Sequence, residues 1–136
     1  DVAVAVAAPS GLITPIVRHA DCKSIGQISD EMRELAGRAK AGRLRPEEFQ
    51  GGGFTISNLG MHGIRQFSAI VNPPQACILA VGAAEQRPVV RNGAIAIATL
   101  MTCTLSIDHR SVDGVLGAEF LGVFKALIEA PVALVM

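Results

Sequence analysis

Residues 92–114 read NGAIAIATLMTCTLSIDHRSVDG, and their pattern is the most informative of the chain. Apolar side chains alternate with small or polar ones along its middle, which is typical of a β-strand. Asn92-Gly93 favours a tight turn, so residues 88–104 are expected to form a hairpin whose second arm is long. That arm runs directly into a polar cluster at residues 108–114. We therefore expect functional side chains where this strand ends.

The sequence on both sides of this stretch predicts further regular elements. After Asp113, apolar residues at helical spacing indicate a helix that must stop at Pro131, because proline cannot continue it. Before the hairpin, residues 76–81 form a short apolar strand after a double proline. Residues 54–58 form another strand, which follows three glycines.

The first third of the chain also contains strands and a helix. Residues 2–6 alternate between valine and alanine, and after a break residues 12–17 resume an extended pattern. Ser24 and Gln27 have the spacing of a capping box and begin an amphipathic helix that reaches about residue 41. Such blocks of strands and helices predict an α/β (α+β) fold, a two-layer sandwich of a mixed sheet with helices on one face.

Composition limits the partners of the chain. With 136 residues it is expected to be one domain or part of one. Lys plus Arg (12) equal Asp plus Glu (12), so nothing favours binding to nucleic acid. The first 50 residues hold 14 charged groups and the other 86 hold 10, so part of the charge-poor surface is expected to meet other protein. No segment offers the roughly 20 apolar residues of a membrane span. We expect an oligomer without nucleic-acid or membrane partners.

The cysteines indicate the redox compartment of the chain, and the first residues indicate its position in a longer protein. Cys22, Cys77 and Cys103 are odd in number and widely spaced, which favours neither a disulfide framework nor a zinc site and fits a reducing compartment. The sequence begins inside a strand pattern without an initiator methionine, as expected for the end of a longer protein.

The polar cluster contains a natural general base. His109 can take up and return a proton near neutral pH, since an unperturbed imidazole has a pKa of about 6.5. Asp113 can cap the following helix, hold Arg110 or shape the loop. Cys103 lies about 20 Å from His109 along a continuous strand, which argues against a Cys-His nucleophile. Ser57 is not part of a GxSxG turn, and phosphate-binding glycine motifs are absent from the sequence.

Three segments carry a family resemblance. They resemble the landmark motifs of the dihydrolipoamide acyltransferases and follow one another in the same order: FTISNLG at residues 54–60, IVNPPQA at 70–76 and DHRSVDG at 108–114. The resemblance covers essentially all of residues 1–136 and aligns with the C-terminal part of the family's catalytic domain. It leaves out the lipoyl domain, the subunit-binding domain and the first segment of the catalytic domain. Residues 60–83 are most similar to the acetyltransferase branch, which serves the pyruvate dehydrogenase complex, although His62 replaces an aromatic residue usual there.

The resemblance implies a fold and a reaction. The fold is that of the chloramphenicol acetyltransferases, here incomplete at the N-terminus. The activity is that of a dihydrolipoyllysine-residue acetyltransferase, which transfers an acetyl group between a dihydrolipoyl arm on a separate domain and coenzyme A, with no metal. His109 is implied as the general base, Ser57 as the donor to the oxyanion, and Asp113 as a third catalytic residue. Asp108 and Arg110 are implied to orient the loop.

The resemblance also implies an assembly. A homotrimer places the histidine of one chain opposite the serine of the next, and trimers join into a cubic or dodecahedral core. The apolar tail, with Leu134, Val135 and Met136, is implied to contact a neighbouring trimer. The lipoyl domain is a substrate partner, and the decarboxylase and dihydrolipoamide dehydrogenase components bind through the missing domains. The implied location is a bacterial cytoplasm or a mitochondrial matrix.

Several alternatives remain at this point. The chain can be an assembly module of a trimeric core that has no activity of its own. The transferred group can be succinyl or a branched-chain acyl group instead of acetyl. A chloramphenicol-type acetyltransferase is a further alternative, but the contexts of Ser57 and His109 match that family less well.

Overall fold

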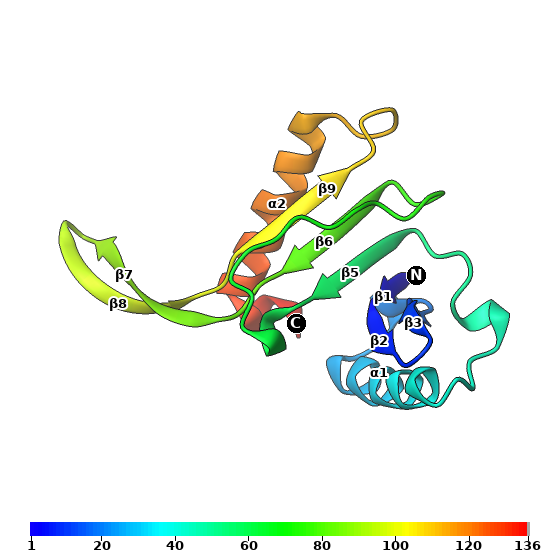
Figure 1. Cartoon of the computed structure of the whole chain (residues 1–136). Helices are drawn as coiled ribbons and strands as arrows, with labels where there is room; N and C mark the ends of the chain where they lie inside the picture. Colours follow the sequence, from blue (N-terminus) through cyan, green and yellow to red (C-terminus); the bar gives the residue numbers. More distant parts are fainter. Residues whose placement is uncertain (136) are drawn as a thin grey trace.

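The computed structural model describes residues 1–135 and is built around a five-stranded mixed sheet (Figure 1). The strands lie in the order β4-β1-β5-β6-β9. Strands β1, β5 and β6 are parallel, and the two edge strands are antiparallel to their neighbours. The bounds are β1 Val2–Val4, β4 Ile16–Val17, β5 Phe54–Asn58, β6 Cys77–Val81 and β9 Cys103–Ile107. The predicted mixed sheet is confirmed.

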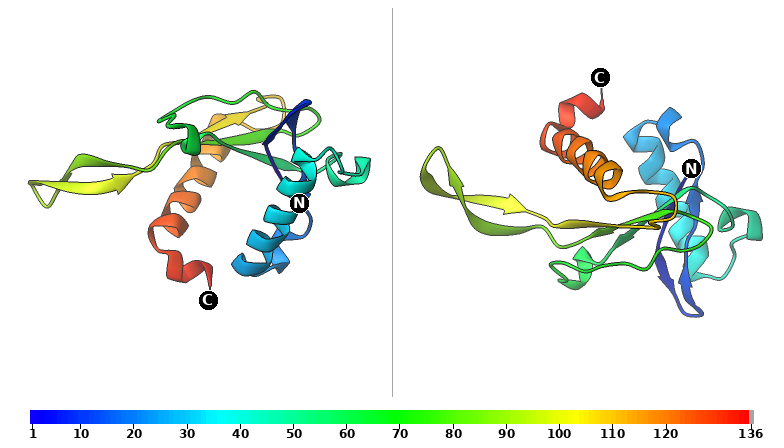
Figure 2. Two further views of the ribbon diagram at one scale, coloured as in Figure 1. Left: turned by 60° about the horizontal axis from the view of Figure 1, so that its bottom comes forward. Right: turned by 90° about the horizontal axis from the view of Figure 1, so that it is seen from above.

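Two helices cover one face of this sheet. Figure 2 shows α1 (Ile25–Lys40) and α2 (Gly114–Glu129) on the same side, which confirms the two-layer sandwich. Helix α1 begins with the predicted capping box. The Ser24 hydroxyl accepts a hydrogen bond from the backbone N–H of Gln27 at 3.2 Å, and the Ser24 N–H donates to the Gln27 side chain at 2.8 Å. Both bonds satisfy N–H groups that a helix start would otherwise leave unpaired.

Helix α2 packs on β9 and β5. Gly117 is buried, and a Cβ atom there would lie 3.6 Å from the Leu105 side chain and 3.8 Å from that of Ile107. The ring of Phe120 lies 5.5 Å, centroid to centroid, from the ring of Phe54. Leu105, Ile107 and Phe54 therefore face the helical layer. Because side chains alternate along a strand, their immediate neighbours face the opposite side of the sheet.

Short elements complete the chain. Strands β2 (Val6–Ala8) and β3 (Gly11–Ile13) form an antiparallel pair beside the sheet. Single 3-10 turns are η1 Ala20–Cys22, η2 Pro46–Glu48, η3 Gly60–His62 and η4 Pro131–Leu134. The η4 turn confirms that α2 stops before Pro131. Met136, the last predicted assembly residue, lies outside the described residues.

The predicted hairpin is confirmed, but its continuous second arm is wrong. Strands β7 (Glu85–Arg91) and β8 (Ala94–Leu100) pair across Asn92-Gly93, both of which have positive φ. The expected long arm is interrupted at Met101 and Thr102, because β8 pairs with β7 whereas β9 pairs with β6. The hairpin consequently projects away from the body of the molecule (Figure 1).

Much of the charge-poor part of the chain is exposed in a single protomer. Val90, Ile95 and Ile97 on the hairpin are 74–81% exposed, and Val115 and Val123 on α2 are 62–70% exposed. Exposed apolar surface of this kind marks contacts with other protein. Among residues 1–135, none of the helices combines the length and hydrophobicity needed to cross a membrane.

Candidate functional site

Ser57 lies on the sheet face opposite the helices. It belongs to β5, pairs with Ala80 of β6, and follows Thr55 on the same side of the strand. Together with Thr55 it lines a groove of about 570 Å³. The segment 67–72, which leads into β6, and residues of the β2–β3 region form the other walls. The Ser57 hydroxyl is thus placed beside an open groove that can hold a substrate.

His109 lies at the far end of β9, in the turn that leads to α2. The backbone N–H groups of Ser111 and Val112 both donate to the carbonyl of Asp108 at 2.9 Å, which closes this turn. The His109 side chain is exposed, and within the described residues no hydrogen bond reaches its imidazole. Its ring is therefore available to a substrate or to another chain.

Arg110 holds Asp108 rather than Asp113. The Arg110 guanidinium contacts both carboxylate oxygens of Asp108, at 2.7–3.2 Å, and the Arg110 backbone N–H donates to the same group at 3.1 Å. These hydrogen bonds, the side-chain ones first, lower the pKa of Asp108 to about 2. Asp108 is therefore charged at neutral pH and fixes the turn on one side of His109.

Asp113 caps helix α2. Its carboxylate accepts a hydrogen bond from the backbone N–H of Leu116 at 2.8 Å. Of the three roles that the sequence left open for this residue, the structure therefore shows the cap. In residues 1–135 its carboxylate makes no hydrogen bond to His109 or Arg110.

One chain does not bring Ser57 and His109 together. Ser57 pairs with Ala80, and Ala80 pairs with Thr104 of β9, so Ser57 and Thr104 lie at the same level two strands apart. His109 follows Thr104 by five residues. With strands about 4.8 Å apart and about 3.3 Å per residue, the two side chains are separated by roughly 15–20 Å. Each chain thus carries two distant parts of a candidate site.

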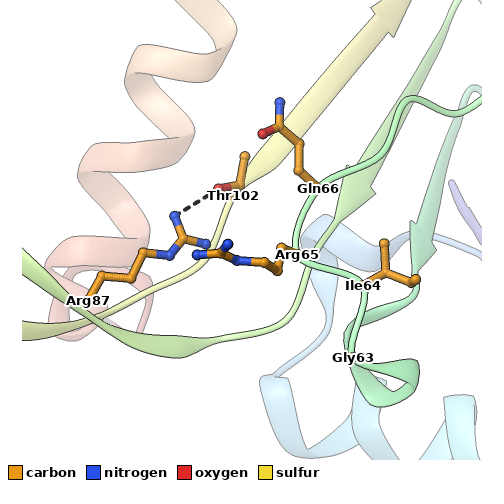
Figure 3. A pocket seen from close by; sticks show the side chains of 6 residues that line it. All are labelled: Gly63, Ile64, Arg65, Gln66, Arg87 and Thr102. Carbon is orange, nitrogen blue, oxygen red and sulfur yellow. Dashed lines mark hydrogen bonds between the residues drawn. The ribbon is translucent and has the colours of Figure 1, made fainter.

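Sequence reasoning missed an ionic cluster at the base of the hairpin. One oxygen of Glu85 accepts from Arg87 at 2.7 Å and from Arg65 at 2.6 Å, and these bonds lower the pKa of Glu85. Arg87 also donates to Thr102 at 3.4 Å beside a surface hollow of about 660 Å³ (Figure 3). The cluster ties the loop after η3 to the hairpin. Arg65 and Glu85 are 20 residues apart, and the sequence contains no periodic signal that joins them.

The three cysteines lie in different environments. Burial raises the pKa of the Cys77 and Cys103 thiols, which disfavours their thiolates, and Cys22 is exposed and unpaired with another cysteine. Among residues 1–135 there is no group of three or more His, Cys, Asp or Glu side chains arranged to hold a metal ion.

Comparison with protein families gives one match over the full sequence. The family described as 2-oxoacid dehydrogenases acyltransferase (catalytic domain) matches residues 1–136. A relative from Rickettsia felis, the dihydrolipoyllysine-residue acetyltransferase component of pyruvate dehydrogenase complex, is 60% identical over 96% of this chain and 32% of its own length.

Solved structures share the fold. A crystal structure of the Azotobacter vinelandii dihydrolipoamide acetyltransferase comes from a study of a serine, a histidine and an asparagine in its catalytic mechanism. It has a TM-score of 0.95 and 36% identity, over 99% of this chain and 56% of that chain. The cubic core of the pyruvate dehydrogenase multienzyme complex matches with the same values. The chain therefore spans about a third of the curated relative and just over half of each solved chain.

Proposed function

This chain belongs to the 2-oxoacid dehydrogenase acyltransferase family, and on that premise we propose that it is part of the catalytic domain of a dihydrolipoyllysine-residue acetyltransferase. Its reaction is the transfer of an acetyl group between a dihydrolipoyl arm and coenzyme A within a pyruvate dehydrogenase complex. Coenzyme A is a co-substrate, and the lipoyl group belongs to a separate domain. The two exchanging groups are both thiols.

One observation carries the proposal. The Azotobacter protein's studied histidine follows its serine by 52 positions, and its asparagine follows that histidine by four. In this sequence His109 follows Ser57 by the same 52 positions, and Asp113 follows His109 by four. Ser57, His109 and Asp113 are thus supported by spacing as well as by the motifs that contain them.

His109 acts as the general base. A thiol with a pKa near 8.5 is mostly protonated at neutral pH, so its sulfur is a poor nucleophile. The imidazole of His109 takes the proton of the coenzyme A thiol as the sulfur attacks the thioester carbonyl. When the tetrahedral intermediate collapses, the carbon–sulfur bond to the dihydrolipoyl arm breaks. The departing sulfur takes the proton back from the imidazolium, so no net proton is gained or lost.

Ser57 stabilises the oxyanion. The attacked carbonyl oxygen becomes negatively charged, and the Ser57 hydroxyl donates a hydrogen bond to it. A donor that is fixed before the reaction stabilises this charge most effectively, because no reorientation is required. The position of Ser57 in a sheet strand beside a groove supports this role.

The surrounding charged residues hold the turn that carries His109. Asp108 and Arg110 orient the turn through their ion pair. Asp113 fixes the start of α2 through its cap, and the asparagine at the corresponding spacing in the Azotobacter protein indicates that an uncharged side chain can serve there. No metal is needed for this reaction.

The active site is completed between chains. Because Ser57 and His109 lie roughly 15–20 Å apart within one chain, a second copy has to supply the missing partner. A homotrimer satisfies this for every site by symmetry. The likeness to a cubic core supports assembly of such trimers into a cubic core, with a dodecahedral core as the alternative. Leu134 and Val135 in the exposed tail, with Met136, are the proposed contacts between trimers.

Other partners and the location follow from the same reaction. The lipoyl domain delivers the acetyl group, and the decarboxylase and dihydrolipoamide dehydrogenase components perform the steps before and after the transfer. A bacterial cytoplasm or a mitochondrial matrix is the proposed location. The bacterial relative supports the first of these.

Alanine substitutions in the full-length protein test the proposal. His109→Ala is expected to lower kcat for acetyl transfer to coenzyme A by about 10²–10⁴-fold. Ser57→Ala is expected to lower it by about 10²–10³-fold. Light scattering verifies that each variant still assembles. Unchanged kcat in an assembled His109→Ala protein would falsify the proposal.

Two alternatives are distinguished by activity. Apolar side chains left exposed on α2, such as Val115 and Val123, favour an assembly module that works only with further protein packed against it. Under that alternative the 136-residue chain forms trimers but does not acetylate thiols, whereas the full-length protein does. A comparison of acetyl, succinyl and branched-chain acyl donors identifies the transferred group.

A further inference from the structure

Gln75 has no role in the proposed mechanism, yet it is one of two buried polar side chains in the described part of the chain. Gln75 is 6% exposed and Thr55 is 1% exposed. The Thr55 hydroxyl donates a hydrogen bond to the Gln75 side-chain oxygen. The Gln75 amide nitrogen donates to the carbonyl of Gly51 at 3.1 Å. Both ends of the Gln75 amide are therefore satisfied, as burial of a polar group requires.

These two bonds hold the strand that carries Ser57. Thr55 lies two residues before Ser57 on the same face of β5, and Gly51 lies just before the strand begins. The Gln75 side chain lies close to the backbone that precedes β5. A Cβ atom at Gly52 would lie 3.3 Å from the Gln75 amide nitrogen, and Gly52 has a φ of +78° that favours glycine. Gln75 lies shortly before Ile78, the β6 residue that pairs with Thr55 of β5.

The residue after Gln75 contacts the turn that carries His109. The carbonyl of Ala76 accepts a hydrogen bond from the backbone N–H of Asp108 at 2.7 Å. The backbone N–H of Gln75 donates to the carbonyl of Asn72 at 3.0 Å, which closes the turn in front of it. One short segment, residues 75–76, therefore touches the β5 strand on one side and the turn before His109 on the other.

We propose that Gln75 is a positioning residue that sets the placement of the Ser57 strand relative to the His109 turn within each chain. This inference rests on the proposed function. In a symmetric assembly each site joins the serine of one chain to the histidine of another, so an error of placement within the chain recurs at every site. Misplacement of a reacting group lowers the rate of the chemical step more than it lowers substrate binding.

Paired substitutions in the full-length, assembled protein test this role. Thr55→Val keeps the side-chain shape and removes the hydroxyl, whereas Thr55→Ser keeps the hydroxyl. Thr55→Val and Gln75→Met are expected to lower kcat about 10–100-fold. KM for coenzyme A and for the acetylated lipoyl domain is expected to stay within about twofold. Thr55→Ser is expected to retain most of kcat.

Leu35→Val is the control for a general loss of stability. Leu35 is buried in α1 and takes part in neither hydrogen bond, so this variant should lower the melting temperature and leave kcat nearly unchanged. Equal losses of kcat in Thr55→Ser and Thr55→Val would overturn the inference. So would a loss in Leu35→Val equal to that in Thr55→Val. If Gln75→Met does not fold, the comparison of kcat between Thr55→Val and Thr55→Ser tests the positioning role by itself. An inactive wild-type protein would contradict the proposed function instead.

Discussion

At the scale of single residues, Glu48 is the most strongly held carboxylate beside helix α1. It accepts hydrogen bonds from the Arg38 guanidinium at 2.7 and 2.8 Å and from the backbone N–H of Arg45 at 2.8 Å. These bonds, with Arg38 first, lower the pKa of Glu48 from 4.5 to about 2. As the pH falls, the unfolded chain therefore takes up this proton before the folded chain does.

Acid should destabilise the protein partly through Glu48. The stabilising contribution of a lowered carboxyl pKa is present above the pKa of the unfolded chain and is lost as the pH falls toward the folded pKa. We expect the melting temperature to fall from about pH 5 toward pH 2, and to fall less in Glu48→Gln. Arg38→Met should flatten the profile in the same way. Thermal melts of both variants that kept the wild-type slope would contradict this.

The residues of the site differ in how far sequence could predict them. Ser57 and His109 lie in motifs, whereas the sequence offered Asp113 as a partner for Arg110 and the structure shows Asp108 instead. The Thr55–Gln75 bond joins residues 20 positions apart in different segments. Only the fold brings these two together, and a polar residue inside a strand pattern does not reveal its partner.

At the scale of elements, the start of α2 depends on one cap. Asp113→Ala removes the acceptor for the Leu116 N–H and should cost about 1 kcal/mol of stability, because that N–H is left without its partner. Asp113→Asn keeps a hydrogen-bond acceptor and should lower stability by at most about a few tenths of a kcal/mol. Urea denaturation of both variants measures the difference. Equal destabilisation by alanine and asparagine would show that the carboxylate charge matters more than the cap.

The loop after η3 approaches β6 at a glycine. A Cβ atom at Gly82 would lie 1.9 Å from the backbone carbonyl oxygen of Arg65. Because the contacting atom belongs to the backbone, no side-chain rotation can remove this clash. Gly82→Ala should therefore lower the free energy of unfolding by about 3 kcal/mol or more. Gly122→Ala is the matched control, because a Cβ atom there meets nothing within 4 Å and alanine favours a helix. Denaturation curves in which the two variants coincide would refute this packing.

Local signals predicted most of the elements. The capping box at Ser24 and the Asn92-Gly93 turn act through neighbouring residues, so the sequence contains them in full. The break between β8 and β9 was not predictable in this way. Strand alternation continues through Met101 and Thr102, while the pairing partner changes from β7 to β6. A period of two records the side-chain faces of a strand and carries no information about its neighbours.

At the scale of the whole molecule, the separation of Ser57 and His109 predicts complementation. Co-expressed Ser57→Ala and His109→Ala chains mix at random, so about one quarter of the sites receive an intact serine and an intact histidine. We expect purified mixed assemblies to show about that fraction of wild-type activity, measured as acetyl transfer to coenzyme A.

A matched control removes this rescue. Ser57→Ala chains co-expressed with Ser57→Ala/His109→Ala chains contain no serine at position 57, so their activity should not exceed that of Ser57→Ala alone. Mixed assemblies of the two single variants with no gain over either parent would indicate that serine and histidine of the same chain work together.

The charge-poor part of the chain contributes exposed apolar surface. In one protomer the hairpin and parts of α2 expose Val90, Ile95 and Val123. The low charge of residues 51–136 fits surface that the proposed assembly would cover, and composition does not distinguish such surface from an internal core.

The distance between the serine strand and the histidine turn has a consequence for a newly made protomer. Under the proposed function, such a polypeptide would hold the general base of one active site and the oxyanion donor of another, so it would be inactive until it assembles with further copies. Acetyl transfer would then require completed oligomerisation, and unassembled subunits would leave acetyl donors unreacted.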